Sequence, residues 1–206
     1  MKDMFLLFAH YYSSIRTICV FILIAVTVVA VMAAVKPAIA AEHGKILVVY
    51  FSGSGNTRNA ANDIAELTGA DVFELKPTQP YSEEDLDYTD RDSRCVKERN
   101  DPKLQHVELV ASTVSNWSEY DTVFIGYPIW WGVAAWPVNT FIEANDFTGK
   151  RVIPFCTHGG SGLGSSGERL AKAAATGEWQ KGRGFRNRFS KSDISSWLKD
   201  IGLIAE

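Results

Sequence analysis

The chain has 206 residues, of which 46% are hydrophobic and 22% charged, and its formal net charge is −3. This length suits one globular domain, and the composition excludes a low-complexity or disordered chain. The mildly acidic balance argues against a nucleic-acid-binding surface, which needs a strongly basic patch.

Residues 1–40 differ in composition from the rest of the chain. The apolar stretch Ile18 to Val35 carries no charge, follows two basic residues and precedes the small-residue site Ala38-Ile39-Ala40. This pattern predicts a secretory signal peptide cleaved before Ala41. An uncleaved membrane anchor is the main alternative, because eighteen helical residues span about 27 Å; a buried core helix is the other. With the basic residues on its N-terminal side, either a signal peptide or an anchor predicts that the domain, residues 41–206, lies outside the cytoplasm.

Two cysteines, Cys95 and Cys156, remain after the leader. Their number and spacing predict neither a disulfide framework nor a metal cluster. Cys156 ends an apolar run and is predicted to be a small core residue. A disulfide between the two is the alternative in an oxidising compartment.

The domain begins with an apolar run, 45–51, followed at once by Ser52-Gly53-Ser54-Gly55-Asn56-Thr57 and then by a helical pattern that ends at Gly69. This order predicts a strand, a phosphate-binding loop and a helix. Backbone N–H groups converge at a helix N-terminus, where the helix dipole also favours an anion. The glycines let the backbone approach the phosphate closely, and the hydroxyl and amide side chains add donors.

This loop has three alternative interpretations. A P-loop is excluded because the loop contains no lysine. A dinucleotide-binding fingerprint is excluded because Arg58 stands where glycine or alanine is required. An ordinary turn, in which Asn56 or Thr57 caps the helix, stays open as the alternative.

Further along the chain, helical and strand patterns alternate. The residues 72–75 predict a short strand, and the polar stretch 81–101 predicts a loop followed by a surface helix near 88–99. Further strands are predicted at 106–110, 121–127, 151–156 and 182–185, and further helices at 137–143, 163–175 and 194–201. This alternation predicts an α/β domain with a parallel sheet, in which ligands bind at the carboxyl ends of the strands.

Two more segments leave the carboxyl ends of predicted strands. The first is Pro128-Ile129-Trp130-Trp131-Gly132, whose indole faces suit stacking on a flat aromatic ligand; core packing of the tryptophans is the alternative, and we expect one of the pair to be a core residue. The second is Thr157-His158-Gly159-Gly160-Ser161-Gly162, which offers backbone N–H groups to the polar edge of a heterocycle, a plain connection being the alternative. His158 is the titratable side chain expected near such a ring, although a lone histidine is more often a surface residue.

These three segments resemble the flavodoxin-like family, and the similarity runs from about Lys45 to Leu203. The resemblance implies a doubly wound five-stranded parallel sheet in the order 2-1-3-4-5, with helices on both faces and non-covalently bound FMN. It implies that 52–57 hold the phosphate and that 128–132 and 157–162 are the flavin loops. Tyr88 is a candidate second aromatic over the ring. His158 departs from the pattern, because serine is expected there in much of the family.

The resemblance favours a one-electron carrier that acts with a redox partner protein of unknown identity. Without residues 1–40 the chain carries 18 basic and 23 acidic residues, which suits a basic partner or simply keeps the domain soluble. An FMN-dependent NAD(P)H:quinone or nitro-compound reductase is the first alternative, and a membrane-anchored scaffold without redox activity is the second. Membrane contact is expected only through an uncleaved N-terminal segment.

Overall fold

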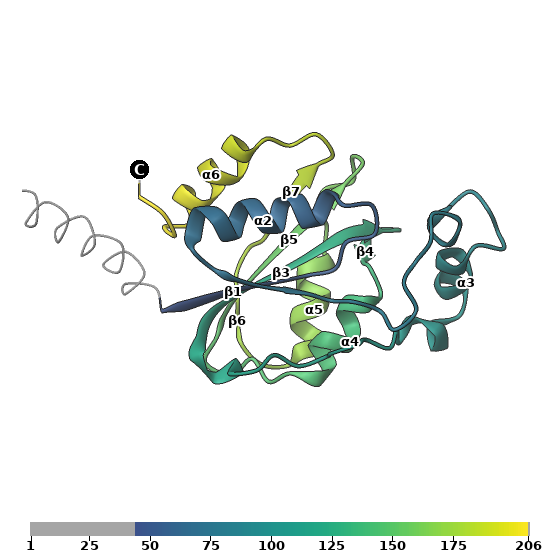
Figure 1. Ribbon diagram of the computed structural model, residues 1–206, viewed down its shortest axis with the longest axis horizontal. Coiled ribbons are helices and arrows are strands. Elements are labelled where there is room, and N and C mark those ends of the chain that lie inside the picture. The colour runs from purple at the N-terminus through teal and green to yellow at the C-terminus, as the bar shows by residue number, and fades with distance from the viewer. Residues whose placement is uncertain (1–43, 206) are drawn as a thin grey trace, which may run out of the picture. The chain divides into compact units, whose positions relative to one another are not determined.

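The computed structural model describes residues 44–205, which form an α/β domain around a central sheet (Figure 1). The sheet runs in the order β2-β1-β3-β5-β6, and all neighbours along this path are parallel. The strands are β1 (Lys45–Tyr50), β2 (Asp71–Glu74), β3 (Tyr120–Trp130), β4 (Val133–Ala134), β5 (Arg151–His158), β6 (Glu178–Trp179) and β7 (Arg183–Arg186).

The predicted flavodoxin-like strand order is confirmed. The fifth position of the parallel sheet is shared by two short strands, because β6 pairs with the first half of β5 and β7 pairs with its second half. The chain between them leaves the sheet at Gly182, where a side chain would collide with Pro154. The sequence prediction found β7 and missed β6, whose two residues are too few to produce a strand pattern.

Helices cover both faces of the sheet. These helices are α2 (Asn56–Thr68), α4 (Pro137–Ala144), α5 (Ser166–Ala174) and α6 (Lys191–Asp200), whereas α3 (Arg94–Asn100) lies away from the sheet in the insertion between β2 and β3. Val48 packs with α2 and α6 on one face, and its neighbour Val49 packs with α4 and α5 on the other. Both valines are fully buried, as expected for a parallel strand covered on both sides.

The polar insertion between β2 and β3 differs from its prediction in two places. The helix expected near 88–99 begins only at Arg94, because the carboxylates of Asp87 and Asp90 accept backbone N–H groups two residues later and hold the chain in turns. The strand expected at 106–110 is reduced to a single bridge between Leu109 and Pro77. The bonds of this bridge are donated by the Thr78 and Val110 N–H groups, and Pro80, the next residue that would face the partner segment, has no N–H to extend the pairing.

Both domain cysteines are free and buried, so the disulfide alternative is wrong. Cys156 lies in β5, where burial raises the pKa of its thiol to about 12; Cys95 lies in α3. Between residues 44 and 205 the structure has no helix of the length and apolarity needed to cross a membrane. The predicted leader, residues 1–40, lies outside the described residues.

Candidate cofactor-binding site

The three predicted loops meet at one edge of the sheet. They follow β1, β3 and β5, which are parallel neighbours, so their carboxyl ends lie side by side. Pro128 is in register with Thr157, and the Thr157 hydroxyl lies 2.8 Å from that of Thr57 in a buried hydrogen bond. At the end of β1, the Phe51 ring packs 5.7 Å from that of Trp130. These contacts hold three segments that lie far apart in the sequence in one place.

The first loop presents unfilled backbone donors. Helix α2 begins at Asn56, and its N-cap is Gly55 in a left-handed conformation with φ of 91°, so no side chain caps the helix. The alternative that Asn56 or Thr57 serves as the cap is therefore wrong. Ser52 accepts the Gly55 N–H through its hydroxyl at 3.1 Å and shapes the turn. The first-turn N–H groups have no intrahelical acceptor, and this is the arrangement that binds a phosphate.

Arg58 lies in the same helical turn but is directed elsewhere. Its guanidinium pairs with the carboxylate of Glu74 on β2, the neighbouring strand. The loop therefore offers a phosphate the backbone dipoles, hydroxyls and the Asn56 amide, with no arginine pointing at it. Glu74, which the dinucleotide interpretation would assign to a ribose, instead fixes this arginine.

The second segment is a β-hairpin and not the loop that the sequence predicted. Pro128, Ile129 and Trp130 extend β3, and Trp130 pairs with Val133 of β4. Only Trp131 and Gly132 form the turn, with φ of 47° and 83°. Two successive positive φ values are typical of the type I′ turn that closes tight hairpins. A tryptophan in this conformation is strained by about 1–2 kcal/mol.

The two tryptophans have different surroundings. Trp130 packs edge-on against Phe51, against Tyr81 at 5.3 Å and against Trp136 at 5.9 Å, and is the core residue of the pair. Trp131 points outward with 37% of its surface exposed. Its indole is parallel to that of Trp136 at 6.5 Å, and the Arg99 guanidinium lies 4.9 Å above it. Trp131 is thus the indole available to a ligand.

The polar insertion completes an apolar cavity beside this hairpin. The cavity has a volume of about 270 Å³ and is lined by Leu86, Tyr88, Cys95, Ile129, Trp130 and Trp131. Tyr88 is 75% exposed at its rim, so the structure brings this predicted residue next to the hairpin. Leu86 and Cys95 were not predicted. Leu86 also touches the first loop, since a side chain at Gly53 would come within 3.2 Å of it.

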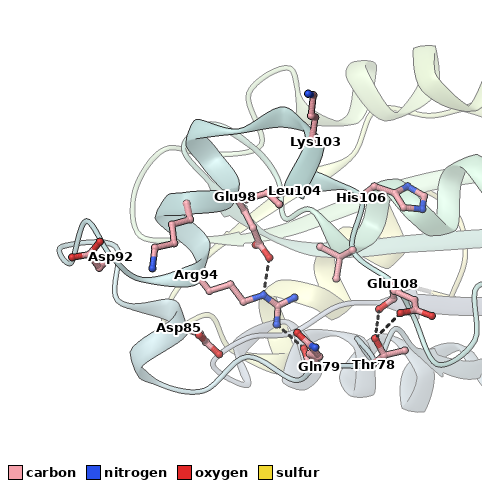
Figure 2. Close-up of a pocket in the computed structure, with 12 residues that line it drawn as sticks. Thr78, Gln79, Asp85, Asp92, Arg94, Glu98, Lys103, Leu104, His106 and Glu108 are labelled. Carbon is pink, nitrogen blue, oxygen red and sulfur yellow. Dashed lines mark hydrogen bonds and ion pairs between the residues drawn. The ribbon is translucent and has the colours of Figure 1, made fainter.

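A larger and more polar cavity, of about 520 Å³, lies within the insertion itself (Figure 2). Figure 2 shows the Arg94 side chain reaching towards Glu98 and Gln79, and hydrogen bonds of 2.7 Å join it to both. Glu98 is buried and also accepts the Tyr81 hydroxyl at 2.7 Å. Because these groups satisfy one another, they serve to hold the insertion together beneath Trp130.

The third segment is shorter than predicted, because Thr157 and His158 belong to β5. His158 Nδ1 accepts the Gly162 N–H at 3.1 Å and ties the loop back on itself. Burial, and secondly the charge of Arg186, lower the pKa of His158, which favours the neutral ring that this bond requires. Gly159 and Gly160 face open space, so their backbone remains accessible, together with the exposed Ser161. Arg186 comes from β7 and was not predicted.

These residues fit FMN. The uncapped start of α2 suits a phosphate, Trp131 and Tyr88 suit a planar ring, and the Gly159–Gly162 backbone suits the ring's polar edge. Gly55 supports this fit, because nothing in the protein lies within 4 Å of the position a Cβ would take there. Residues 44–205 contain no group of three or more His, Cys, Asp or Glu side chains that could hold a metal ion.

Known proteins resemble this chain in sequence and in fold. The family model described as flavodoxin matches residues 45–201. A candidate flavoprotein from Bacteroides eggerthii DSM 20697 is 42% identical over 77% of this chain and 98% of that chain, with a TM-score of 0.70. One from Bacteroides uniformis ATCC 8492 is 39% identical over 76% and 99%, with the same TM-score.

A more distant structure is a flavoprotein in complex with FMN from Lactobacillus acidophilus NCFM. It is 22% identical over 75% of this chain and 98% of that chain, with a TM-score of 0.53, and it shows the shared fold. No curated protein matched the chain. The family match over most of the described residues and the two Bacteroides relatives lead to one conclusion: the chain belongs to the flavodoxin family.

Proposed function

We propose that this flavodoxin binds FMN non-covalently and carries electrons between partner proteins outside the cytoplasm. The observation that carries the proposal is the uncapped N-terminus of α2 at the same sheet edge as an outward tryptophan and a glycine-rich loop. The separate features suit a phosphate, a ring and a polar ring edge, and FMN combines all three.

The residues would divide the binding between them. Residues 52–57 would hold the phosphate through first-turn N–H groups and hydroxyls. Trp131, the aromatic residue of the hairpin 128–132 that faces outward, and Tyr88 would contact the ring, while the 159–162 backbone would bind its polar edge. His158 would keep that loop in shape through its bond to Gly162. FMN itself supplies the redox chemistry when bound; the protein orients it and limits its contact with water.

The leader supports a role outside the cytoplasm. Its basic start, apolar stretch and Ala38-Ile39-Ala40 site are those of an export signal. Nicotinamide cofactors are scarce outside the cytoplasm, which favours a carrier over an NAD(P)H-dependent reductase. A carrier also needs its cofactor near the surface, and the partial exposure of Trp131 and Tyr88 fits that need.

The first experiment is an absorbance titration of the purified protein with FMN and, as a matched control, with riboflavin, which lacks the phosphate. We expect flavin bands shifted by binding, and an affinity for FMN at least 100-fold above that for riboflavin. Absence of binding after FMN addition would support the scaffold alternative and overturn the proposal.

Stopped-flow mixing of the FMN-loaded protein with NADH or NADPH separates carrier from reductase. We expect slow reduction that shows no saturation with nicotinamide concentration. Fast, saturable reduction would make the protein a reductase. Fractionation of the producing cells tests the location, and a wholly cytoplasmic protein with an intact leader would contradict the proposed export.

A further inference from the structure

A dense cluster of positive charge lies at the end of β7. Residues 181–191 contain five basic residues, and no acidic residue occurs between Glu178 and Asp193, although the whole chain has a net charge of −3. All five side chains are exposed. We call them the basic turn; they are Lys181, Arg183, Arg186, Arg188 and Lys191.

Only part of this charge is neutralised within the protein. Arg183 lies 3.8 Å from Asp200, and Lys191 pairs with Glu66. The nearby Asp193 carboxylate is occupied with the N–H and hydroxyl of Ser190 at the start of α6. Lys181, Arg186 and Arg188 have no ion pair with any residue in 44–205. The basic turn therefore presents unbalanced positive charge to solvent.

The basic turn lies next to the proposed flavin-edge loop. Arg186 is opposite His158 in the pairing of β7 with β5, and the Asn187 N–H donates to the His158 carbonyl at 3.0 Å. Gly184 sits against the same histidine, because a side chain at Gly184 would come within 3.1 Å of the imidazole. From here the chain turns into α6 (Figure 1). A cavity of about 300 Å³ opens at this turn and is lined by Arg183, Arg186 and Arg188 among others.

The opposite side of the candidate site is acidic. Residues 83–92 contain six acidic residues and one basic residue, Arg91. This segment includes Tyr88 at the rim of the apolar cavity and Leu86, which contacts the phosphate loop at Gly53. The sheet edge therefore carries negative charge beside the first loop and positive charge beside the third.

We propose that the basic turn is a docking surface for an acidic face of a protein redox partner, which it draws to the flavin-edge loop. The proposal rests on the proposed function. It predicts an acidic contact face on the partner, whereas the acidic net charge of this chain suggests a basic one. Salt screens charges beyond a Debye length of roughly 10 Å. Charged side chains next to the cofactor edge therefore affect the approach of a partner protein more than charges on the opposite side of the domain.

The presence of both positive and negative charge at this sheet edge favours a protein partner over a membrane or a nucleic acid. A membrane or a nucleic acid is uniformly negative and would be repelled by residues 83–92, whereas a protein can match both signs. A second copy of this chain could also pair acidic segment with basic turn. That pairing would cover the proposed cofactor edge of both copies and leave no route for electrons, so we assign the surface to a different protein.

The first test measures anion binding without using the flavin. Fluorescein-labelled hexaglutamate, a carboxylate probe, is titrated against the purified protein, its Arg186→Gln/Arg188→Gln variant and a matched Lys172→Gln/Lys199→Gln variant. Lys172 and Lys199 are exposed near the C-terminal ends of α5 and α6, which lead back to the opposite edge of the sheet. We expect salt-sensitive binding that weakens at least fivefold in the arginine variant and less than twofold in the lysine variant. Equal weakening in both, or none in either, would overturn the proposal.

The second test follows electron transfer. With FMN bound and reduced, ferricyanide, an anionic one-electron oxidant, should react faster at low than at high ionic strength, despite the acidic net charge. Hexaammineruthenium(III), a cationic oxidant that the acidic segment attracts instead, should react no more slowly with the arginine variant than with the native protein. The arginine variant should lose at least half of the ferricyanide salt effect, and the lysine variant should keep it; the reverse would overturn the proposal.

Three further outcomes are decisive. If phosphatidylserine vesicles bind the protein more tightly than hexaglutamate does, and only the arginine variant loses this binding, the surface belongs to a membrane and the proposal fails. A salt-sensitive dimer in sedimentation velocity, lost in the arginine variant, would assign the surface to a second copy instead. Failure to bind FMN would overturn the proposed function alone, because the hexaglutamate result does not depend on the flavin.

Discussion

The proposed phosphate loop and the tryptophan hairpin lie at the same sheet edge but are built in opposite ways. Residues 52–57 depend on local backbone geometry: a left-handed Gly55, a hydroxyl that shapes the turn and a helix that starts without a cap. The hairpin depends on distant residues. Trp130 is held by Phe51, Tyr81 and Trp136, and Trp131 lies near Trp136 and Arg99.

If FMN binds as proposed, this difference means that the candidate site would recognise the phosphate and the ring through separate parts of the structure. A helix N-terminus binds a phosphate wherever the backbone donors are left open, so few tertiary contacts are needed. A stacking face must be held rigid, and rigidity comes from packing. Substitutions in the two regions should therefore affect flavin binding differently. Riboflavin keeps the ring and lacks the phosphate, so comparing its binding with that of FMN distinguishes the two effects.

The largest expected effect is on stability and comes from Trp130. Trp130→Ala removes a side chain packed against three other rings and should lower the free energy of unfolding by about 3 kcal/mol. Urea unfolding followed by circular dichroism measures this change. Trp130→Phe keeps most of the packing and is the control. A loss below 1 kcal/mol for the alanine variant would show that Trp130 does not hold the hairpin.

The second effect is on phosphate recognition and comes from Ser54, which is exposed in the first loop. Ser54→Asp places a negative charge beside the proposed phosphate and should weaken FMN binding by about 2 kcal/mol, roughly 30-fold. Riboflavin binding should stay within twofold, and Ser196→Asp, an equal charge on α6, should change neither. Stability should not fall, because a carboxylate near a helix N-terminus is favourable. Equal weakening of FMN and riboflavin would place the phosphate elsewhere.

The third effect is on ring recognition and comes from Trp131. Trp131→Asn removes the exposed indole and should weaken FMN and riboflavin equally, by about 1 kcal/mol. Asparagine accepts a positive φ readily, so relief of backbone strain should roughly offset the lost contacts with Trp136 and Arg99 in stability. Isothermal titration with both flavins gives the affinities. A weakening confined to FMN would contradict the division between the two regions.

The smallest effect is a pH dependence that comes from His158 in the third loop. Its lowered pKa means that the unfolded chain binds more protons between that pKa and 6.5, the ordinary histidine value. Its contribution to stability is complete above pH 6.5 and is lost as the pH falls through this window. His158→Asn offers an oxygen to the Gly162 N–H without titrating. Between pH 7.5 and pH 5.5, the free energy of unfolding should therefore fall more for the native protein than for this variant, as measured by urea unfolding. Equal drops would show that His158 titrates normally.

The sequence predicted a parallel sheet because buried parallel strands are continuous apolar runs, and 45–51, 121–127 and 151–156 are such runs. The order of its strands came from the resemblance to the flavodoxin-like family. The sequence predicted the positions of the three ligand segments from the apolar runs, since each follows a strand. It misplaced the boundary between strand and loop at Pro128–Trp130 and at Thr157–His158. In both places pairing with a neighbouring strand, β4 or β7, extends the strand beyond the apolar run.

The insertion shows where prediction from sequence stopped. Nothing local in 81–101 indicates that Leu86 meets Gly53, that Cys95 lines the apolar cavity, or that Glu98 is buried between Tyr81 and Arg94. A polar, turn-rich segment has no periodicity that marks an inner face. Leu86 lies 33 positions from Gly53, and Glu98 lies 17 positions from Tyr81, so only the folded chain reveals these contacts.

The sequence by itself predicted the fold class from apolar periodicity, the family from the motifs of three segments, and a phosphate loop from a glycine-rich strand-to-helix junction, because these signals lie within a few neighbouring residues. Only the tertiary structure decided which tryptophan faces outward, that His158 ties down the third loop, and that the basic turn lies beside that loop. The physical reason is that side-chain orientation and local charge are set by which distant strands and loops pack together.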